Sequence, residues 1–193
     1  YLPPFFDHRS RIVWSEIELV NGVAEIHNPI ARECLRFCGA AQGVEIHYDG
    51  DLPARSGLGS SSAFAVGLLH ALHGLQGKMP SKKQLALDAI YVEQERVKAC
   101  VGFQDSVNAA YGGLNRIDFR SGEDFSVAPV VLPPGVEADL QRHLMLFYTG
   151  EARDASEVAQ DQVRLTPLRE TELTAIQEMV PLAVEKLARG DVT

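Results

Sequence analysis

The sequence predicts an α+β fold in which strands come first, helices follow and strands return. Three observations support this prediction. Short β-branched or alternating runs occur near the start and in the middle of the chain, and apolar stretches with helical spacing lie between them. Glycine- and proline-rich turns separate the two kinds of segment. Because strands and helices do not alternate strictly, the order favours α+β over a parallel α/β sheet.

Composition narrows the class of protein. The 193 residues are 46% hydrophobic and 23% charged, as is usual for a globular chain. A net charge of −8 gives no positive field to hold nucleic acid or an anionic membrane. The first residues lack a signal-peptide pattern, and no apolar run approaches the roughly 18 residues of a bilayer span. Three sparse cysteines argue against a disulfide framework. We expect a cytoplasmic protein with neither nucleic acid nor membrane as partner and leave its oligomeric state open.

The first elements are predicted from β-branched residues and from capping residues. Residues 11–20 predict one strand that ends in a turn at residues 21–22. Asn28, followed by proline, predicts the start of a helix that ends at Gly39. Residues 43–48 alternate as a half-buried strand does.

The middle of the chain predicts helices, and strands follow them. A capping box at Ser81 predicts a helix that continues to about Lys98. Residues 102–111 predict a turn and a short helix, and residues 114–119 and 125–132 predict strands.

The last segments begin with a proline-rich linker at residues 133–135. We expect an apolar strand at residues 144–148 and helices at residues 155–165 and 167–188.

A glycine–serine loop lies between the strand at residues 43–48 and an apolar helix. The loop reads Gly57-Leu-Gly-Ser-Ser-Ser62, and the helix is predicted to start at about Ser61. Glycines without β-carbons let backbone N–H groups approach an anion, and a helix N-terminus adds its dipole. The string is neither a Walker A loop nor a dinucleotide-binding fingerprint. A glycine–serine turn that only caps a buried helix is the structural alternative.

The string from Pro53 to Ala63 resembles the second motif of the GHMP kinases. The wider region from Gly50 to Leu72 most resembles the heptose 7-phosphate 1-kinase branch and galactokinase-like sugar kinases. The resemblance extends to residues 146–150. It implies the GHMP kinase fold, with residues 1–135 as a partial N-terminal domain like domain 2 of ribosomal protein S5. Residues 136–193 would begin a ferredoxin-like C-terminal domain. It also implies ATP as cofactor, bound by Ser56, Gly57, Leu58, Gly59, Ser60, Ser61 and Ser62.

Glu93 interrupts an apolar helix face that Ala86, Ala89, Ile90 and Val97 form by their spacing. A glutamate on a buried face needs a partner, and the pattern alone fits a structural salt bridge equally well. The resemblance implies a magnesium-binding glutamate on this helix, twelve residues before the catalytic aspartate. We therefore expect Glu93 and Ser61 to share a Mg²⁺ ion, which prefers hard oxygen ligands.

Asp105 follows a glycine turn at Gly102. By pattern alone such an aspartate is more often a helix N-cap. The resemblance implies that Asp105 is the catalytic residue that polarises or deprotonates the attacking hydroxyl. Two neighbours depart from the family pattern, which usually has a glutamine directly after the aspartate and a small residue two before it. This chain has Ser106 and Phe103 at these positions.

The resemblance implies transfer of the γ-phosphoryl group of ATP to a hydroxyl of a sugar or sugar phosphate, with O1 of heptose 7-phosphate favoured. A galactose- or fucose-type kinase is one alternative. A catalytically inactive relative that only binds sugar and nucleotide is another. The chain begins at Tyr1 without methionine, and we expect it to be a fragment that phosphorylates no sugar alone.

Several other residues could suggest a site. His70 and His73 are spaced as a metal pair, but their apolar surroundings favour packed histidines. Cys34 and Cys38 could share a metal, although free cysteines usually pack as small hydrophobes. Trp14 could stack on an adenine, but we expect it in the core or at its edge. For Arg55, phosphate contact and solvation stay equally open.

Overall fold

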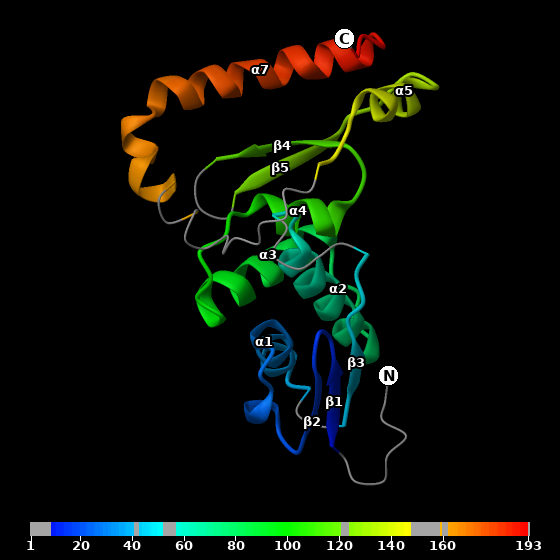
Figure 1. Ribbon diagram of the computed structural model, residues 1–193, viewed down its shortest axis with the longest axis vertical. Coiled ribbons are helices and arrows are strands. Elements are labelled where there is room, and N and C mark those ends of the chain that lie inside the picture. The colour runs from blue at the N-terminus through cyan, green and yellow to red at the C-terminus, as the bar shows by residue number, and fades with distance from the viewer. Residues whose placement is uncertain are drawn as a thin grey trace. The chain divides into compact units, whose positions relative to one another are not determined.

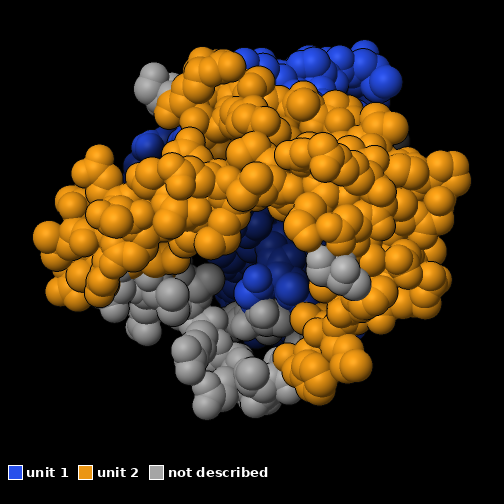
Figure 2. All heavy atoms as spheres, turned by 90° about the horizontal axis from the view of Figure 1, so that it is seen from above, with its two compact units in different colours: residues 1–111, 152–156 blue, residues 112–151, 157–193 orange. Residues whose placement is uncertain are grey.

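The computed structural model describes residues 9–40, 43–51, 57–120, 124–147, 159 and 162–192 (Figure 1). The chain divides into two compact units, coloured separately in Figure 2. The first comprises residues 1–111 and 152–156, and the second comprises residues 112–151 and 157–193. The boundary expected at residue 135 concerns the domains of the whole protein and stays a prediction. Strands and helices are mixed in both units, which fits the predicted α+β class.

A three-stranded sheet of order β2-β1-β3 opens the first unit. Strand β1 (Ser10–Val13) pairs antiparallel with β2 (Ile17–Val20) and parallel with β3 (Glu45–His47). The single strand predicted over residues 11–20 is therefore wrong. A turn, in which the Trp14 N–H donates to the Glu16 carbonyl at 2.9 Å, divides it into a hairpin. Both arms are rich in β-branched residues, so composition alone does not reveal the break.

Helix α1 (Pro29–Cys38) has both predicted ends. The Asn28 side chain caps its start by accepting a hydrogen bond from the Ala31 N–H at 2.9 Å. Gly39 ends it in the left-handed conformation, with a φ of 66°.

Helix α2 (Ser60–Leu75) follows the glycine–serine loop, and α3 (Lys82–Tyr91) begins at the Ser81 cap as predicted. The prediction of a regular helix to Lys98 is wrong, because α3 passes into a π-helix, η2 (Val92–Arg96). Its backbone bonds reach one residue further than α-helical ones, as in the 2.9 Å bond from the Val97 N–H to the Val92 carbonyl. Helix α4 (Gln104–Tyr111) completes the unit.

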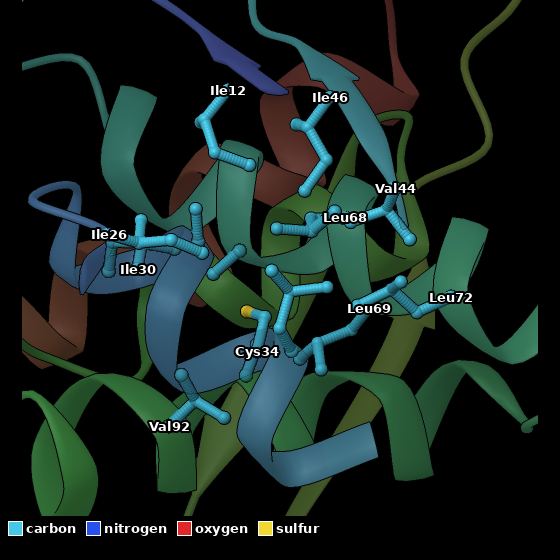
Figure 3. Packing of buried hydrophobic residues seen from close by; sticks show 14 of the residues in the cluster. Ile12, Ile26, Ile30, Cys34, Val44, Ile46, Leu68, Leu69, Leu72 and Val92 are labelled. Carbon is cyan, nitrogen blue, oxygen red and sulfur yellow. The ribbon is translucent and has the colours of Figure 1, made fainter. Parts of the chain in front are cut away.

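The core of the first unit lies where α1, α2 and the sheet meet (Figure 3). Ile12 from β1, Leu35 from α1 and Leu69 from α2 are fully buried there. A short 3-10 helix, η1 (Val23–Glu25), leads into α1. Each buried aliphatic side chain contributes about 1.5–3 kcal/mol of transfer free energy. This packing fixes α2, and with it the start of α2 at the glycine–serine loop.

The second unit contains a two-stranded antiparallel sheet of β4 (Asn115–Phe119) and β5 (Phe125–Pro129). These strands agree with the prediction, although β5 is shorter. Helix α5 (Val136–His143) follows Gly135 and was not predicted. The 3-10 helix η3 (Thr166–Leu168) precedes the long helix α7 (Glu170–Ala188).

The strand predicted at residues 144–148 does not form over its described part, Leu144 to Phe147. The four side chains there are 66–80% exposed, and no described strand pairs with them. An apolar run can form a stable strand only where a neighbour accepts its hydrogen bonds, so hydrophobicity alone misled the prediction. Of the helix predicted at residues 155–165, residues 162–165 are helical, and residues 155–158 and 160–161 lie outside the described part. None of the described helices has the length and apolarity to cross a membrane.

Candidate active site

The glycine–serine loop leads directly into the first turn of α2. Gly57 and Gly59 both adopt the left-handed conformation, with φ angles of 75° and 70°. Gly59 is the N-cap of α2, and Ser60, Ser61 and Ser62 form its first turn. The N–H groups of a first helical turn have no partner within the helix, so this end of α2 can bind an anion. Ser56, also predicted to bind nucleotide, lies outside the described residues.

The Glu93 side chain is fully buried, and hydroxyl groups surround its carboxylate. Ser61 Oγ donates to Glu93 Oε1 at 2.9 Å. Ser62 Oγ and Ser106 Oγ donate to Oε2 at 2.8 and 2.9 Å. These bonds join η2 to the first turns of both α2 and α4. The predicted partnership of Glu93 with Ser61 is therefore present in the geometry, while their sharing of a metal ion stays a prediction.

Asp105 lies in the first turn of α4 and is exposed. Its side chain packs against the backbone of Gly59, where a β-carbon would lie 3.0 Å from Asp105 Cγ. Gly59 thus makes the room that Asp105 occupies. Glu93 contacts the same turn of α2 through the serines, so the two predicted carboxylates are both brought to the start of this helix.

The Ser61–Glu93 pair fits a magnesium ion by the chemistry of its donor atoms. The 2.9 Å between Ser61 Oγ and Glu93 Oε1 is the length of the hydrogen bond that joins them, and it brings the two oxygens close enough to share one ion. Both atoms are hard oxygens, and Ser61 is exposed, which leaves space for water or phosphate oxygens as further ligands. Ser61 and Glu93 could therefore hold Mg²⁺.

A second buried carboxylate, Glu33 on α1, supports the segment that carries Glu93. Arg36 and Arg32 donate to it at 2.7 and 3.1 Å. Arg96, in η2, donates at 3.4 Å. Burial raises the pKa of Glu33, but the bonds and charges of Arg32 and Arg36 outweigh it, so the pKa is lowered. Glu33 is therefore an anion that ties α1 to η2.

Among the described residues, no group of three or more His, Cys, Asp or Glu side chains is placed to hold a metal ion. Burial raises the pKa of the Cys34 and Cys38 thiols, which favours the neutral form. The packed role expected for His70 is wrong, because its side chain is exposed on α2. His73 is half-buried, with Nε2 3.3 Å from Asp88 Oδ2. Trp14 is half-buried as expected and donates to Glu18 Oε1 at 2.9 Å.

Sequence reasoning missed the role of Ser106 and the contacts of Tyr48. Ser106 was noted only as a departure from the family pattern, and its spacing of thirteen residues from Glu93 does not reveal their hydrogen bond. The Tyr48 hydroxyl donates to the Ser60 carbonyl at 3.2 Å, and its ring stacks on Phe64 with centroids 4.2 Å apart. Tyr48 also lines an apolar groove of about 770 Å³ between β3 and α2. Arg55 lies outside the described residues.

Comparison with known proteins gives the family context of this site. The family model "GHMP kinases N terminal domain" matches residues 19–113, which include the loop, Glu93 and Asp105. A D-glycero-alpha-D-manno-heptose 7-phosphate kinase from Campylobacter jejuni is 26% identical over 133 residues, which are 69% of this chain and 38% of that protein. A galactokinase from Pyrococcus furiosus is 29% identical over 58% of this chain and 30% of that protein.

A mevalonate kinase from Methanothermobacter thermautotrophicus is 29% identical over 82% of this chain and 50% of that protein. Among solved structures, a D-glycero-D-manno-heptose 1-phosphate kinase from Bacteriodes thetaiotaomicron matches with a TM-score of 0.67 and 17% identity. The match covers 97% of this chain and 60% of that one, and it shows a shared fold. The chain thus spans half or less of these three curated relatives.

Proposed function

The chain belongs to the GHMP kinase family, because residues 19–113 match the N-terminal domain of these kinases, and we propose a function on this basis. The protein would be a Mg²⁺- and ATP-dependent sugar kinase. It would transfer the γ-phosphoryl group of ATP to a hydroxyl of a sugar or sugar phosphate. Phosphoryl transfer of this kind depends on positioning and charge stabilisation more than on covalent chemistry. The site residues must therefore hold phosphates, neutralise their charge and orient the attacking hydroxyl.

One observation carries the proposal: the first turn of α2 contacts two carboxylates from different elements. Ser61 Oγ lies 2.9 Å from Glu93 Oε1, and Gly59 packs against Asp105. A turn that only caps α2 would not need the exposed Asp105 packed against Gly59. It would also not need the fully buried Glu93 hydrogen-bonded to serines of that turn. The arrangement favours a kinase over an inactive relative, because the loop, the proposed metal ligands and the proposed catalytic carboxylate lie together.

Each residue then has a role that its surroundings support. The backbone N–H groups at the start of α2 bind phosphate oxygens, aided by the helix dipole. Ser61 and Glu93 hold Mg²⁺, which supplies positive charge to the phosphates. Asp105, exposed beside Gly59, accepts the proton of the attacking hydroxyl or orients that hydroxyl.

The names of the relatives support the choice of substrate class. The first match is to a heptose 7-phosphate kinase and the next to a galactokinase. We propose O1 of heptose 7-phosphate as the first acceptor to test, and galactose or fucose as the alternatives. Mevalonate belongs in the same panel as a non-sugar alcohol, because a mevalonate kinase also matches.

The test is ADP formation by the intact protein against this panel, with Asp105→Asn as the diagnostic variant. The variant keeps the shape and hydrogen bonding of the side chain but cannot accept a proton, so we expect turnover to fall about 10²–10⁴-fold. Glu16→Gln, an exposed carboxylate in the β1–β2 turn, should leave turnover unchanged. Unaltered turnover in Asp105→Asn would remove Asp105 from the mechanism, and no turnover with any acceptor would oppose a sugar kinase.

A further inference from the structure

The two oxygens of the buried Glu93 carboxylate have different surroundings. Oε2 accepts two hydrogen bonds, from Ser62 at 2.8 Å and from Ser106 at 2.9 Å. Both serines are buried, with 3% and 0% of their surface exposed. Oε1 accepts one bond among the described residues, from Ser61, which is exposed. The carboxylate therefore has a fixed inner oxygen and an outer oxygen that faces the glycine–serine loop.

We propose that Ser106 is a positioning residue that orients Glu93 for metal binding, an inference that rests on the proposed Mg²⁺ and nucleotide site. A carboxylate with one anchored oxygen cannot rotate freely about its terminal torsion, so its other oxygen keeps one direction. With Oε2 held by Ser106 and Ser62, Oε1 stays 2.9 Å from Ser61 Oγ. The two oxygens therefore stay close enough to serve as ligands of one ion.

The position of Ser106 in α4 links this role to Asp105. Successive residues of a helix point about 100° apart, so the same turn can present one side chain outward and the next inward. Asp105 is exposed against Gly59, while Ser106 is fully buried against Glu93. The first turn of α4 thus sets both carboxylates relative to α2.

Calorimetric titration of the intact protein with ADP, with and without Mg²⁺, tests the proposal without turnover. The measured quantity is the factor by which Mg²⁺ tightens ADP binding. Groups that orient a metal ligand typically contribute 10- to 100-fold to metal affinity. We expect Ser106→Ala to reduce the factor about tenfold and to change the affinity for ADP alone much less. Ser106→Thr, which keeps the hydroxyl, should retain most of the factor if the extra methyl group is accommodated.

Ser10→Ala is the matched control, since Ser10 is equally buried, at 3% exposure, but accepts a bond from Val44 N–H in the sheet. Thermal unfolding of both alanine variants measures any general loss of stability. If Ser106 has only a structural role, Ser106→Ala lowers the unfolding temperature as Ser10→Ala does, and Mg²⁺ tightens ADP binding by the same factor as in the parent. That result would overturn the proposal.

A parent whose ADP affinity does not respond to Mg²⁺ would overturn the proposal together with the metal site. If Ser106→Ala loses the factor while no acceptor in the panel is phosphorylated, the role of Ser106 stands and the proposed reaction fails.

Discussion

Glu93 is an ionisable side chain with no exposed surface, a placement that costs folding free energy unless polar partners compensate. Three serine hydroxyls supply these partners for the Glu93 carboxylate. An arginine or a lysine is the other kind of partner that a buried carboxylate can have. An ion pair would neutralise the carboxylate within the protein. Hydroxyl donors satisfy the carboxylate without bringing a positive charge of their own, which suits the proposed role of Glu93 as a magnesium ligand.

Removing either oxygen ligand should weaken the response to magnesium. We expect Ser61→Ala and Glu93→Gln each to raise the Mg²⁺ concentration for half-maximal turnover, because each loses a hard ligand. Nucleotide binding without metal should change less. Glu95→Gln is the matched control, since Glu95 lies in the same π-helix with a side chain that is 61% exposed. Parent-like magnesium dependence in both site variants would show that the ligand assignment is wrong.

Glu33 predicts a pH dependence of stability. Its pKa in the folded protein is below the ordinary 4.5, because Arg32 and Arg36 outweigh the effect of burial. The folded state therefore binds a proton less readily than the unfolded state. The stabilisation by Glu33 is complete above the unfolded pKa and is lost as pH falls through the lowered folded pKa.

Urea unfolding of the parent and of Glu33→Gln from pH 7 down to the acid range measures this effect. We expect the difference in unfolding free energy to be largest at neutral pH and to shrink below the ordinary pKa of 4.5. A difference that widens on acidification would mean that Glu33 is not held as an anion.

At the scale of elements, the start of α2 depends on two glycines that differ in one respect. Both have a positive φ, so alanine at either position costs about 1–2 kcal/mol in backbone strain. A β-carbon on Gly59 would also lie 3.0 Å from Asp105 Cγ, whereas one on Gly57 meets no described residue within 4 Å. We expect Gly59→Ala to lower the free energy of unfolding more than Gly57→Ala, measured by denaturant unfolding without ligand. Equal losses would mean that Asp105 does not pack on Gly59.

Elements with strong local signals could be predicted from the sequence. Helix α1 begins at Asn28 and ends at Gly39 because capping chemistry acts within a few residues. The π-helix was not predictable, since its sequence continues the pattern of α3 and only the hydrogen bonds differ. The break between β1 and β2 escaped prediction because both arms are rich in β-branched residues.

Part of the candidate site could be picked out from the sequence, but the hydrogen bonds that connect its residues could not. The loop, Glu93 and Asp105 stand out through composition, helical phase and family resemblance. The hydrogen bond from Ser106 to Glu93 depends on how α4 packs against η2, and no local pattern encodes that packing. The exposed run from Leu144 to Phe147 shows the reverse case. Its apolar sequence predicts a strand, but no strand among the described residues pairs with it.

At the scale of the 193-residue chain, the loop from Gly57 to Ser62 has a consequence for the kinetics of ligand capture. Residues 57–62 carry no charged side chain, while the 193 residues together carry a net charge of −8. Backbone N–H groups attract a phosphate only at short range. The repulsion between the negatively charged chain and the anionic nucleotide extends over about a Debye length, roughly 10 Å at 0.1 M salt. Added salt should therefore speed the encounter with a nucleotide, in contrast to sites that steer anions with lysine and arginine. Stopped-flow measurement of the association rate constant of a fluorescent ADP from low to physiological ionic strength checks this expectation. A rate constant that falls with salt would indicate that Arg55 or another positive side chain attracts the nucleotide.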